Sequence, residues 1–250
     1  MPNSDAKLIP ERSLWVSPKD SYMHFIRWPW EYLAYLTIFC GLHRKGSVLE
    51  LGCHHGRTAI GLNYYLLPGA RYEGLDILSK QIRWAKSTFD PSIFHFHHAD
   101  VYNGMYNPTG KISPDSYILP FKNEEFNTVF AASLFTHLTP TASHNYFKEI
   151  GRVLKKGGMC LLSFCLLDKV GLERLKDTSC LYSFPYLYKQ SSGVRVKDKN
   201  LPELLIGYYI SSINKLLKGT GLNIDQVLPG YWSNKSENTL NEQDLVIFRK

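Results

Sequence analysis

The sequence predicts an α/β fold built on a doubly wound, mostly parallel sheet. From residue 47 onwards, short apolar segments that resemble buried strands alternate with segments of helical character. Three of the apolar segments carry an acidic residue at or near their end, at Glu50, Asp76 and Asp100. Alternating strands and helices indicate a parallel sheet covered on both faces, and such sheets bind ligands beyond the carboxyl ends of their strands.

The first half of the predicted sheet contains three strands separated by two helices. We expect strands at residues 47–51, 71–77 and 92–100, and helices at residues 56–67 and 79–89. Pro68 and Gly69 are expected to end the first helix, because both residues disfavour helix continuation. Ser79 is expected to cap the second helix, since its hydroxyl can accept a hydrogen bond from a free helical amide.

The second half continues the same alternation. We expect a fourth strand at residues 126–135, a helix at residues 139–158, a fifth strand at residues 158–167 and two last strands at residues 222–232 and 243–250. Thr139 can cap the helix, and Pro140 suits its first position. Apolar residues recur at helical spacing along it, and Gly157 is expected to end it.

Two regions lie outside this regular pattern. Residues 1–45 are predicted to form an N-terminal arm and a cap helix, with the helix starting near Trp30. Residues 46–250 are predicted to form the main domain, with an insertion at about residues 166–220. Within the insertion we expect a helix over residues 201–218.

The composition is that of an ordinary folded chain with a positive charge. Of the 250 residues, 44% are hydrophobic and 20% are charged, as is typical of globular proteins. The net charge of +7 favours an anionic partner, but no run of five basic residues indicates a nucleic-acid-binding tail. Five cysteines without a CxxC pair, a polar N-terminus and the lack of a long apolar run predict a reduced, cytoplasmic protein without a transmembrane segment.

A cofactor-binding turn is predicted at residues 48–57, VLELGCHHGR. The apolar strand carries Glu50, and Gly52 and Gly56 then lead into a helix. Asp76 lies 20 residues beyond Gly56, at the end of the next strand. That spacing suits a carboxylate that binds two ribose hydroxyls. Asp100 closes the third strand, where it could accept a hydrogen bond from an adenine amino group.

The residues of this turn discriminate between two nucleotide cofactors. The NAD fingerprint is G-x-G-x-x-G, and from Gly52 its second and third glycines fall on His54 and Arg57. A pyrophosphate needs the close backbone approach that glycine allows. S-adenosylmethionine has no pyrophosphate and is therefore favoured. An NAD-dependent oxidoreductase stays an alternative, because Asp76 suits either ribose.

The same residues resemble the class I S-adenosylmethionine-dependent methyltransferases. The first motif of that family is E/D-x-G-x-G-x-G, and Glu50, Gly52 and Gly56 match it, with His54 in place of the middle glycine. Residues 133–138, SLFTHL, followed by YFKEIGRVLKKGG and an apolar strand, are similar to the family in their order. The resemblance extends more loosely to a bacterial branch associated with surface sugars and polysaccharides.

The resemblance implies both a fold and a cofactor site. The fold is a Rossmann-like sheet of seven strands, mostly parallel with an antiparallel last strand, plus an N-terminal helical cap. The first motif would hold the methionine end of S-adenosylmethionine, Asp76 the ribose, and Asp100 the adenine. The full set of residues assigned to the cofactor is Glu50, Gly52, Cys53, His54, Gly56, Asp76, Ile77, Asp100, Val101 and Ser133.

His54 has three interpretations. The turn can tolerate a side chain there, at a modest cost in backbone conformation if φ is positive. Alternatively, His54 or His55 contacts the methionine carboxylate of the cofactor. The third interpretation is a cofactor site that has lost its activity.

His137 is the predicted catalytic residue. The sulfonium already activates the methyl group, so a hydroxyl acceptor needs alignment and a base that removes its proton. A histidine at the carboxyl end of the fourth strand suits that role, because its pKa lies near neutral pH. The alternative is a structural role for His137 in the loop before residue 140.

Other chemistries have no support in the sequence. The N/D-P-P-Y/F/W motif of base amino-methylation is replaced by SLFT at residues 133–136. Cys160 and Cys165 lie in an apolar strand and are interpreted as core residues rather than nucleophiles. His95 and His97 share a strand face but lack the spacing of metal ligands, so no metal is predicted.

The acceptor is inferred from the variable regions. Aromatic and basic residues in the N-terminal arm and the insertion suit a sugar that carries a charged group. We therefore expect O-methylation of a saccharide or a saccharide-linked intermediate. A small amine or natural product as acceptor, and a cofactor-binding scaffold without turnover, stay open as alternatives.

Overall fold

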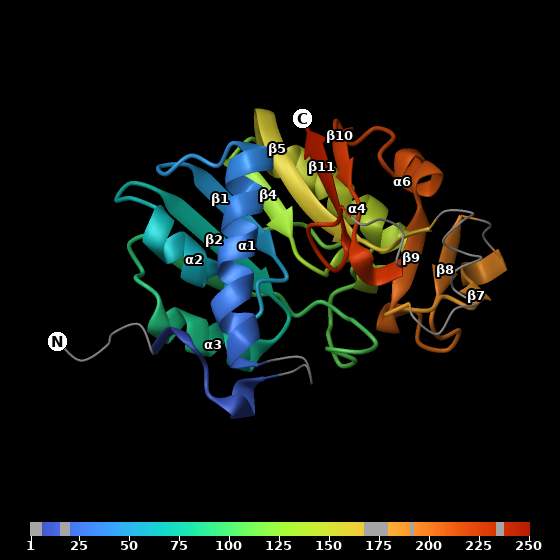
Figure 1. The fold of residues 1–250 in the computed structure, drawn as a ribbon, viewed down its shortest axis with the longest axis horizontal. Coiled ribbons are helices and arrows are strands. Elements are labelled where there is room, and N and C mark those ends of the chain that lie inside the picture. The colour runs from blue at the N-terminus through green and yellow to red at the C-terminus, as the bar shows by residue number, and fades with distance from the viewer. Residues whose placement is uncertain (1–6, 16–20, 168–179, 191–192, 234–237) are drawn as a thin grey trace.

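The computed structural model describes residues 7–15, 21–167, 180–190, 193–233 and 238–250 (Figure 1). The helices are α1 (Tyr22–Cys40), α2 (Arg57–Tyr65), α3 (Ser79–Thr88), α4 (Pro140–Val153) and α6 (Ile210–Leu216). The main strands are β1 (Ser47–Leu51), β2 (Arg71–Asp76), β3 (Phe94–His98), β4 (Phe126–Ala131), β5 (Leu154–Phe164), β10 (Asn223–Leu228) and β11 (Asp244–Arg249). Part of the predicted insertion, residues 168–179, lies outside the described residues.

The main sheet has seven strands in the order β10-β11-β5-β4-β1-β2-β3. Strands β1 to β5 run parallel to one another, and β11 runs antiparallel to both β5 and β10. This order confirms the predicted Rossmann-like sheet with an antiparallel last strand. The strand order reverses between β1 and β4, which is where doubly wound sheets bind their ligands.

Two hydrophobic clusters separate the sheet from its covering helices. One lies under α1, α2 and α3 and contains their inward-facing apolar residues. The other lies under α4 and α6, on the opposite face of the sheet. The chain therefore forms three layers, as the alternation of strands and helices predicted.

Helix α1 begins earlier than expected from the sequence. It starts at Tyr22 rather than near Trp30, because the Ser21 hydroxyl accepts a hydrogen bond from the His24 amide at 3.2 Å and caps the helix. The helix packs closely on α2 at Gly61, where a Cβ would lie 2.5 Å from the Pro29 carbonyl oxygen. Among the described residues, no helix is long and apolar enough to cross a bilayer.

The ends of two other helices differ from the predictions. Thr139 caps α4 as expected, through a 3.4 Å hydrogen bond to the Ala142 amide, but α4 ends at Val153 instead of at Gly157. Leu154 is fully buried and already pairs with β4 at the start of β5. Helix α3 has no side-chain cap, so the expected role of Ser79 was wrong.

The helix expected over residues 201–218 forms only in part, because residues 206–209 are a strand of a second, smaller sheet. Its strands, in spatial order, are β6 (Leu166–Leu167), β9 (Ile206–Tyr209), β8 (Val194–Val196) and β7 (Tyr186–Leu187). Only Ile210–Leu216 of the expected helix is α-helical. Ile206 and Tyr208 are fully buried between neighbouring strands, so tertiary pairing overrides the helical spacing.

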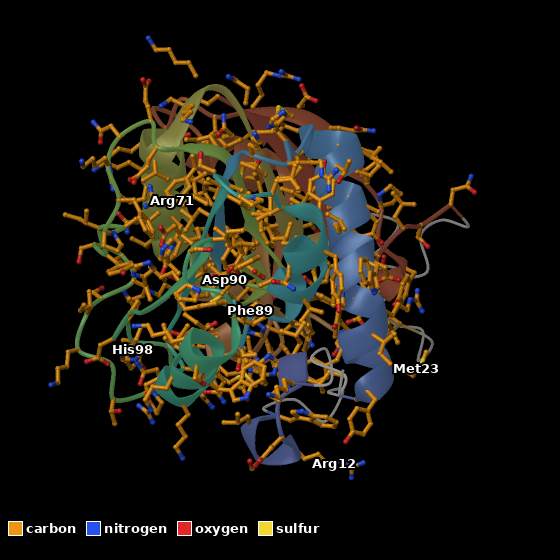
Figure 2. All side chains as sticks on the ribbon, turned by 90° about the vertical axis from the view of Figure 1, so that its left-hand side faces the viewer. Arg12, Met23, Arg71, Phe89, Asp90 and His98 are labelled. Carbon is orange, nitrogen blue, oxygen red and sulfur yellow. The ribbon has the colours of Figure 1, made fainter. Side chains whose placement is uncertain are left out.

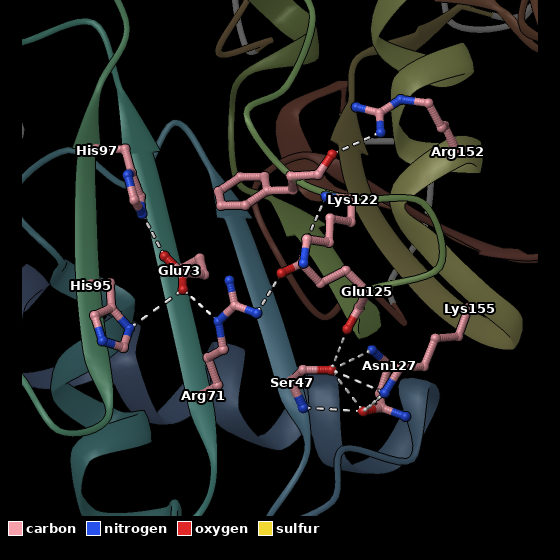
Figure 3. Close-up of polar contacts among 11 residues, drawn as sticks. Ser47, Arg71, Glu73, His95, His97, Lys122, Glu125, Asn127, Arg152 and Lys155 are labelled. Carbon is pink, nitrogen blue, oxygen red and sulfur yellow. Dashed lines mark hydrogen bonds and ion pairs between the residues drawn. The ribbon is translucent and has the colours of Figure 1, made fainter.

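A charge cluster on the neighbouring strands β2 and β3 is centred on the buried Glu73 (Figure 3). The Glu73 carboxylate is 3% exposed and accepts hydrogen bonds from His97 and, at 2.5 Å, from Arg71. His95 lies 3.4 Å from the same carboxylate, and Arg71 also bonds Glu125 at 2.5 Å. The two histidines thus have a structural partner, and no metal-binding group of three or more side chains occurs in the described ranges.

Candidate cofactor and active site

The turn after β1 has three residues in the left-handed region of backbone space. Gly52, His54 and Gly56 have φ values of 75°, 54° and 77°. Gly56 is required for a second reason, because a Cβ there would lie 3.0 Å from the rings of Phe89 and Phe96. Histidine occurs in this left-handed conformation more often than most non-glycine residues do, although the conformation still costs conformational energy. Of the two backbone conformations that the sequence left open at His54, the structure has the one with positive φ, which carries a modest energetic cost.

The Asp76 carboxylate closes this turn. One oxygen accepts a hydrogen bond from the His54 amide at 2.7 Å, and the other accepts from the Leu78 amide at 2.8 Å. The side chain therefore joins the end of β2 to the first-motif turn. Each carboxylate oxygen keeps a second lone pair, so Asp76 can still accept hydrogen bonds from a ribose diol.

Glu50 is buried in β1 and is 3% exposed. The Tyr72 hydroxyl donates a 2.5 Å hydrogen bond to its carboxylate. Burial raises the pKa of Glu50 to about 8, while hydrogen bonds from Tyr72 and Thr58 and the charge of Arg57 act in the opposite direction. The protonated, neutral form of the Glu50 carboxyl group is therefore favoured at neutral pH. Glu50 lies two residues before Gly52 of the cofactor turn.

His55 is the strongest indication that a polar ligand belongs at this turn. It is 1% exposed, and neither ring nitrogen has a hydrogen-bond partner among the described residues. Its ring lies against Phe25 and Trp84, with centroids 4.9 Å and 6.0 Å away, and burial lowers its pKa. A buried imidazole without a partner is costly, and the amino acid end of S-adenosylmethionine would supply partners.

Ser133 lies at the end of β4 with a φ of 61°. Its amide donates to the Ser163 hydroxyl at 2.6 Å, and its own hydroxyl accepts from the Gln243 amide group at 2.8 Å. Ser163 donates in turn to Gln243 at 2.7 Å. Sequence reasoning missed both partners, because Gln243 lies 110 residues away along the chain. This network fixes the loop that leads to His137.

The remaining predicted cofactor residues lie at the same edge of the sheet. Asp100 lies two residues beyond β3 rather than ending it, and its carboxylate accepts a 3.3 Å hydrogen bond from Asn107. Val101 and Cys53 are buried, at 3% and 1% exposure. The Ile77 carbonyl lies 3.2 Å from the His98 ring nitrogen. No hydrogen bond described in the structure joins Asp100 to the first-motif turn.

His137 lies in a short 3-10 helix, Phe135–His137, directly after β4. Its Nδ1 donates a 2.8 Å hydrogen bond to the Glu203 carbonyl oxygen. Because a carbonyl only accepts, Nε2 is the nitrogen that is unprotonated in the neutral ring. Burial lowers the pKa of His137, and the carbonyl groups of Glu203 and Leu204 partly oppose that shift. Figure 2 shows the described side chains of the whole molecule, with Met23 labelled beside α1, where it is 67% exposed.

The structure therefore brings the first motif, Asp76 and the β4 loop to one edge of the sheet. Leu134 connects the β4 loop to the first motif, since its Cβ lies 3.6 Å from where a Cβ on Gly52 would be. Sequence reasoning did not identify Ser163 or Gln243 as members of this constellation, and it gave His55 only as an alternative to His54. His55 alone offered a signal, because it directly precedes the last glycine of the motif.

Comparison with known proteins supports the same interpretation. Residues 48–158 match the family model described as a methyltransferase domain. A Haemophilus influenzae protein described as uncharacterized is 28% identical over 121 residues, which cover 48% of this chain and 43% of that protein. The aligned region thus spans less than half the length of that relative.

Two solved structures share the fold. A SAM-dependent methyltransferase from Methanosarcina mazei is 21% identical, with a TM-score of 0.53 over 84% of this chain and 94% of its own. The [4+2]-cyclase SpnF is 14% identical, with a TM-score of 0.53 over 79% of this chain and 59% of its own. Identities this low speak for the fold alone.

The match of residues 48–158 to a methyltransferase-domain model and the strand order both agree with the predicted family and with S-adenosylmethionine as its cofactor. The saccharide-related branch and the individual site residues stay predictions. Residues 48–158 thus match a methyltransferase domain, and the sheet that contains them shares its fold with a SAM-dependent methyltransferase.

Proposed function

We propose that the chain transfers a methyl group from S-adenosylmethionine to a hydroxyl of a saccharide or saccharide-linked intermediate. The observation that carries this proposal is the geometry of His137, whose Nδ1 is held by the Glu203 carbonyl at 2.8 Å. The opposite nitrogen is thereby left as the proton acceptor at the carboxyl end of β4. A hydroxyl, unlike a neutral amine, benefits from such a base during transfer.

The chain's own residues would hold the cofactor at two points. The first-motif turn and His55 would receive the methionine end, and Asp76 would accept hydrogen bonds from the ribose hydroxyls. When bound, S-adenosylmethionine supplies a methyl group on a positively charged sulfur, and S-adenosylhomocysteine leaves. Asp100 and Val101 would border the adenine, while Ser133 would lie beside the cofactor at β4.

His137 would perform the proton transfer. As the acceptor oxygen takes the methyl group, its hydroxyl proton would move to Nε2 of His137. The Glu203 carbonyl then stabilises the imidazolium through the Nδ1–H group. Burial lowers the pKa of His137, so the free base is available at neutral pH and releases its proton readily to solvent.

Two further observations support parts of the proposal. All five cysteines are free thiols, which fits a reducing compartment such as the cytoplasm. The net charge of +7 favours an anionic acceptor. Several aromatic residues of the N-terminal region, such as Phe25 and Tyr32, are buried in the core, so the acceptor contacts are expected from the insertion instead.

A cofactor-binding protein without methyl transfer is the second candidate. The same fold occurs in a [4+2]-cyclase, so the fold does not by itself imply methyl transfer. His54 also places a side chain in the turn where the first motif of the family carries glycine.

The decisive experiment measures transfer of an isotopically labelled methyl group to a panel of sugar phosphates, nucleotide sugars, amines and phenols. We expect labelled product with a sugar and none with the amines. Binding of S-adenosylhomocysteine, with NAD as the control, is measured in parallel by calorimetry. Cofactor binding without transfer to any acceptor would favour the scaffold, and transfer to an amine would contradict the hydroxyl proposal.

A further inference from the structure

We propose that a hollow beside the second sheet is the acceptor site and that it binds a sugar through its phosphate group. This inference rests on the proposed function, because it names the class of molecule that receives the methyl group. The hollow has a volume of about 540 Å³. The lining residues on which the argument depends are Tyr186, Tyr188, Lys189, Val196, Lys199 and Pro202.

The size and the walls of the hollow fit a monosaccharide phosphate or a nucleotide sugar. Small-molecule sites commonly measure about 300–1,000 Å³ and combine apolar walls with a few polar groups. Val196 is 1% exposed and forms an apolar wall, whereas Tyr186 is 41% exposed. An exposed aromatic ring beside an apolar wall suits the C–H face of a sugar ring.

Two exposed lysines that line the hollow supply positive charge. The Lys199 ammonium lies 4.7 Å from the centroid of the Tyr186 ring, and the Lys189 ammonium lies 5.3 Å from that of Tyr188. Cation–π contacts of this kind hold an ammonium group in place without neutralising its charge. Both lysines can therefore still donate charge-assisted hydrogen bonds to a phosphate.

The acidic residue closest in sequence is already engaged. One oxygen of the Asp198 carboxylate accepts hydrogen bonds from the amides of Asn200 and Leu201, at 2.7 Å and 3.4 Å. This carboxylate thus shapes the loop that carries Lys199. It is not paired with either lysine in any ion pair described for the structure.

The position of the hollow links it to the predicted base. Pro202 lines the hollow, and the next residue, Glu203, holds His137 through its carbonyl. The second sheet itself begins at Leu166, two residues after the end of β5, at the carboxyl edge where the cofactor turn lies. One wall of the hollow therefore adjoins the residue that holds His137 through its Nδ1.

The test is calorimetric titration of the full-length protein, saturated with S-adenosylhomocysteine, with glucose 1-phosphate and with UDP-glucose. Glucose and inorganic phosphate serve as partial ligands. We expect saturable binding of at least one phosphate-bearing sugar, and much weaker binding of glucose and of phosphate alone.

Three variants locate the binding. Lys199→Gln and Tyr186→Leu should each weaken sugar phosphate binding by about tenfold, as expected for loss of a charge-assisted or stacking contact. Lys86→Gln, which removes the same charge from the exposed surface of α3, should leave it unchanged. Melting temperatures show that each variant is folded.

The outcomes separate this inference from the proposed function. If S-adenosylhomocysteine binds but neither phosphate-bearing sugar does, the inference is overturned and the proposed function stands. Equal losses in Lys199→Gln and Lys86→Gln would also overturn it, because the effect would then be general surface charge. If the sugars bind but S-adenosylhomocysteine does not, the proposed function is overturned and the hollow loses its role as an acceptor site.

Discussion

The side chain of Asp76 is hydrogen bonded to the backbone of His54 at 2.7 Å, which connects the carboxylate that would bind ribose to the turn that would bind methionine. The two ends of the cofactor site are therefore coupled before any ligand binds. A ligand at either end should stiffen the other, and a change at Asp76 should be felt across the whole site.

The first prediction concerns Asp76. Asp76→Ala should weaken binding of S-adenosylhomocysteine by about 1.5–3 kcal/mol, as for loss of hydrogen bonds to a charged group. It should also lower the melting temperature, because the amides of His54 and Leu78 lose their acceptor. Calorimetry and thermal unfolding measure the two effects. Asp115→Ala, an exposed control, should change neither, and unchanged affinity in Asp76→Ala would remove this residue from the site.

The second prediction separates the interpretations of His54. Because its φ is 54°, His54→Gly should increase the free energy of unfolding by about 1 kcal/mol, as relief of left-handed strain. Glu124→Gly is the matched control, since Glu124 has the same φ outside the site. If His54→Gly binds S-adenosylhomocysteine as tightly as the parent chain, the side chain only tolerates the turn. Weaker binding in His54→Gly alone would show that the imidazole contacts the cofactor.

A third prediction follows from the raised pKa of Glu50. The pKa is about 8 in the folded chain and 4.5 for an ordinary glutamate. Between these values the unfolded chain has lost the proton and the folded chain retains it, so this group makes the protein less stable as pH rises. Glu50→Gln should remove that contribution. Urea unfolding of both proteins between pH 5 and 8 should show the stability difference shifting in favour of Glu50→Gln with rising pH, and parallel curves would contradict it.

The fourth prediction concerns His137. His137→Gln should lower kcat by roughly 10²-fold or more, the usual contribution of a general base, while the affinity for S-adenosylhomocysteine stays the same. His144→Gln is the matched control, because Nδ1 of His144 also contacts a backbone carbonyl, that of Leu216, at 2.7 Å. The parent's activity should fall at acidic pH and this fall should be absent in His137→Gln. Equal activity of the two variants would return His137 to a structural role.

The fifth prediction concerns the charge cluster of Figure 3. The pKa of Glu73 is lowered overall, because hydrogen bonds from His97 and Arg71 outweigh the opposing effect of burial. Its stabilising contribution is therefore present above pH 4.5 and is lost as pH falls through the folded pKa. Glu73→Gln should cost about 1.5 kcal/mol at pH 7, as for the loss of charge-assisted hydrogen bonds to partly exposed partners. Chemical unfolding measures it, and the more exposed Glu125→Gln should cost less.

The sequence predicted the main sheet well, because strand and helix periodicities dominate where each element is covered on a regular face. The strand ends at Glu50 and Asp76, and the helix cap at Thr139, depend on local chemistry and could be read directly. The second sheet could not, since residues 206–209 form a strand only because β6 and β8 lie beside them.

The site was only partly predictable for a similar reason. Sequence reasoning selected His137 by its position after β4, but its partner is a backbone carbonyl 66 residues away, which no residue type reveals. The double role of the Asp76 carboxylate was hidden in the same way, because its partners are backbone amides. The identity of a side chain indicates which hydrogen bonds it can form. The folded backbone decides which of those hydrogen bonds are already formed within the protein.

The placement of β11 has a consequence for how the chain folds during synthesis. Strand β11 is inserted between β5 and β10, although the ribosome makes it after both of them. Until it emerges, β5 has an unpaired edge and β10 has no neighbour in the main sheet. The main sheet of the nascent chain therefore stays incomplete until β11 has been synthesised. A chaperone that shields the unpaired edge of β5 would act at that stage.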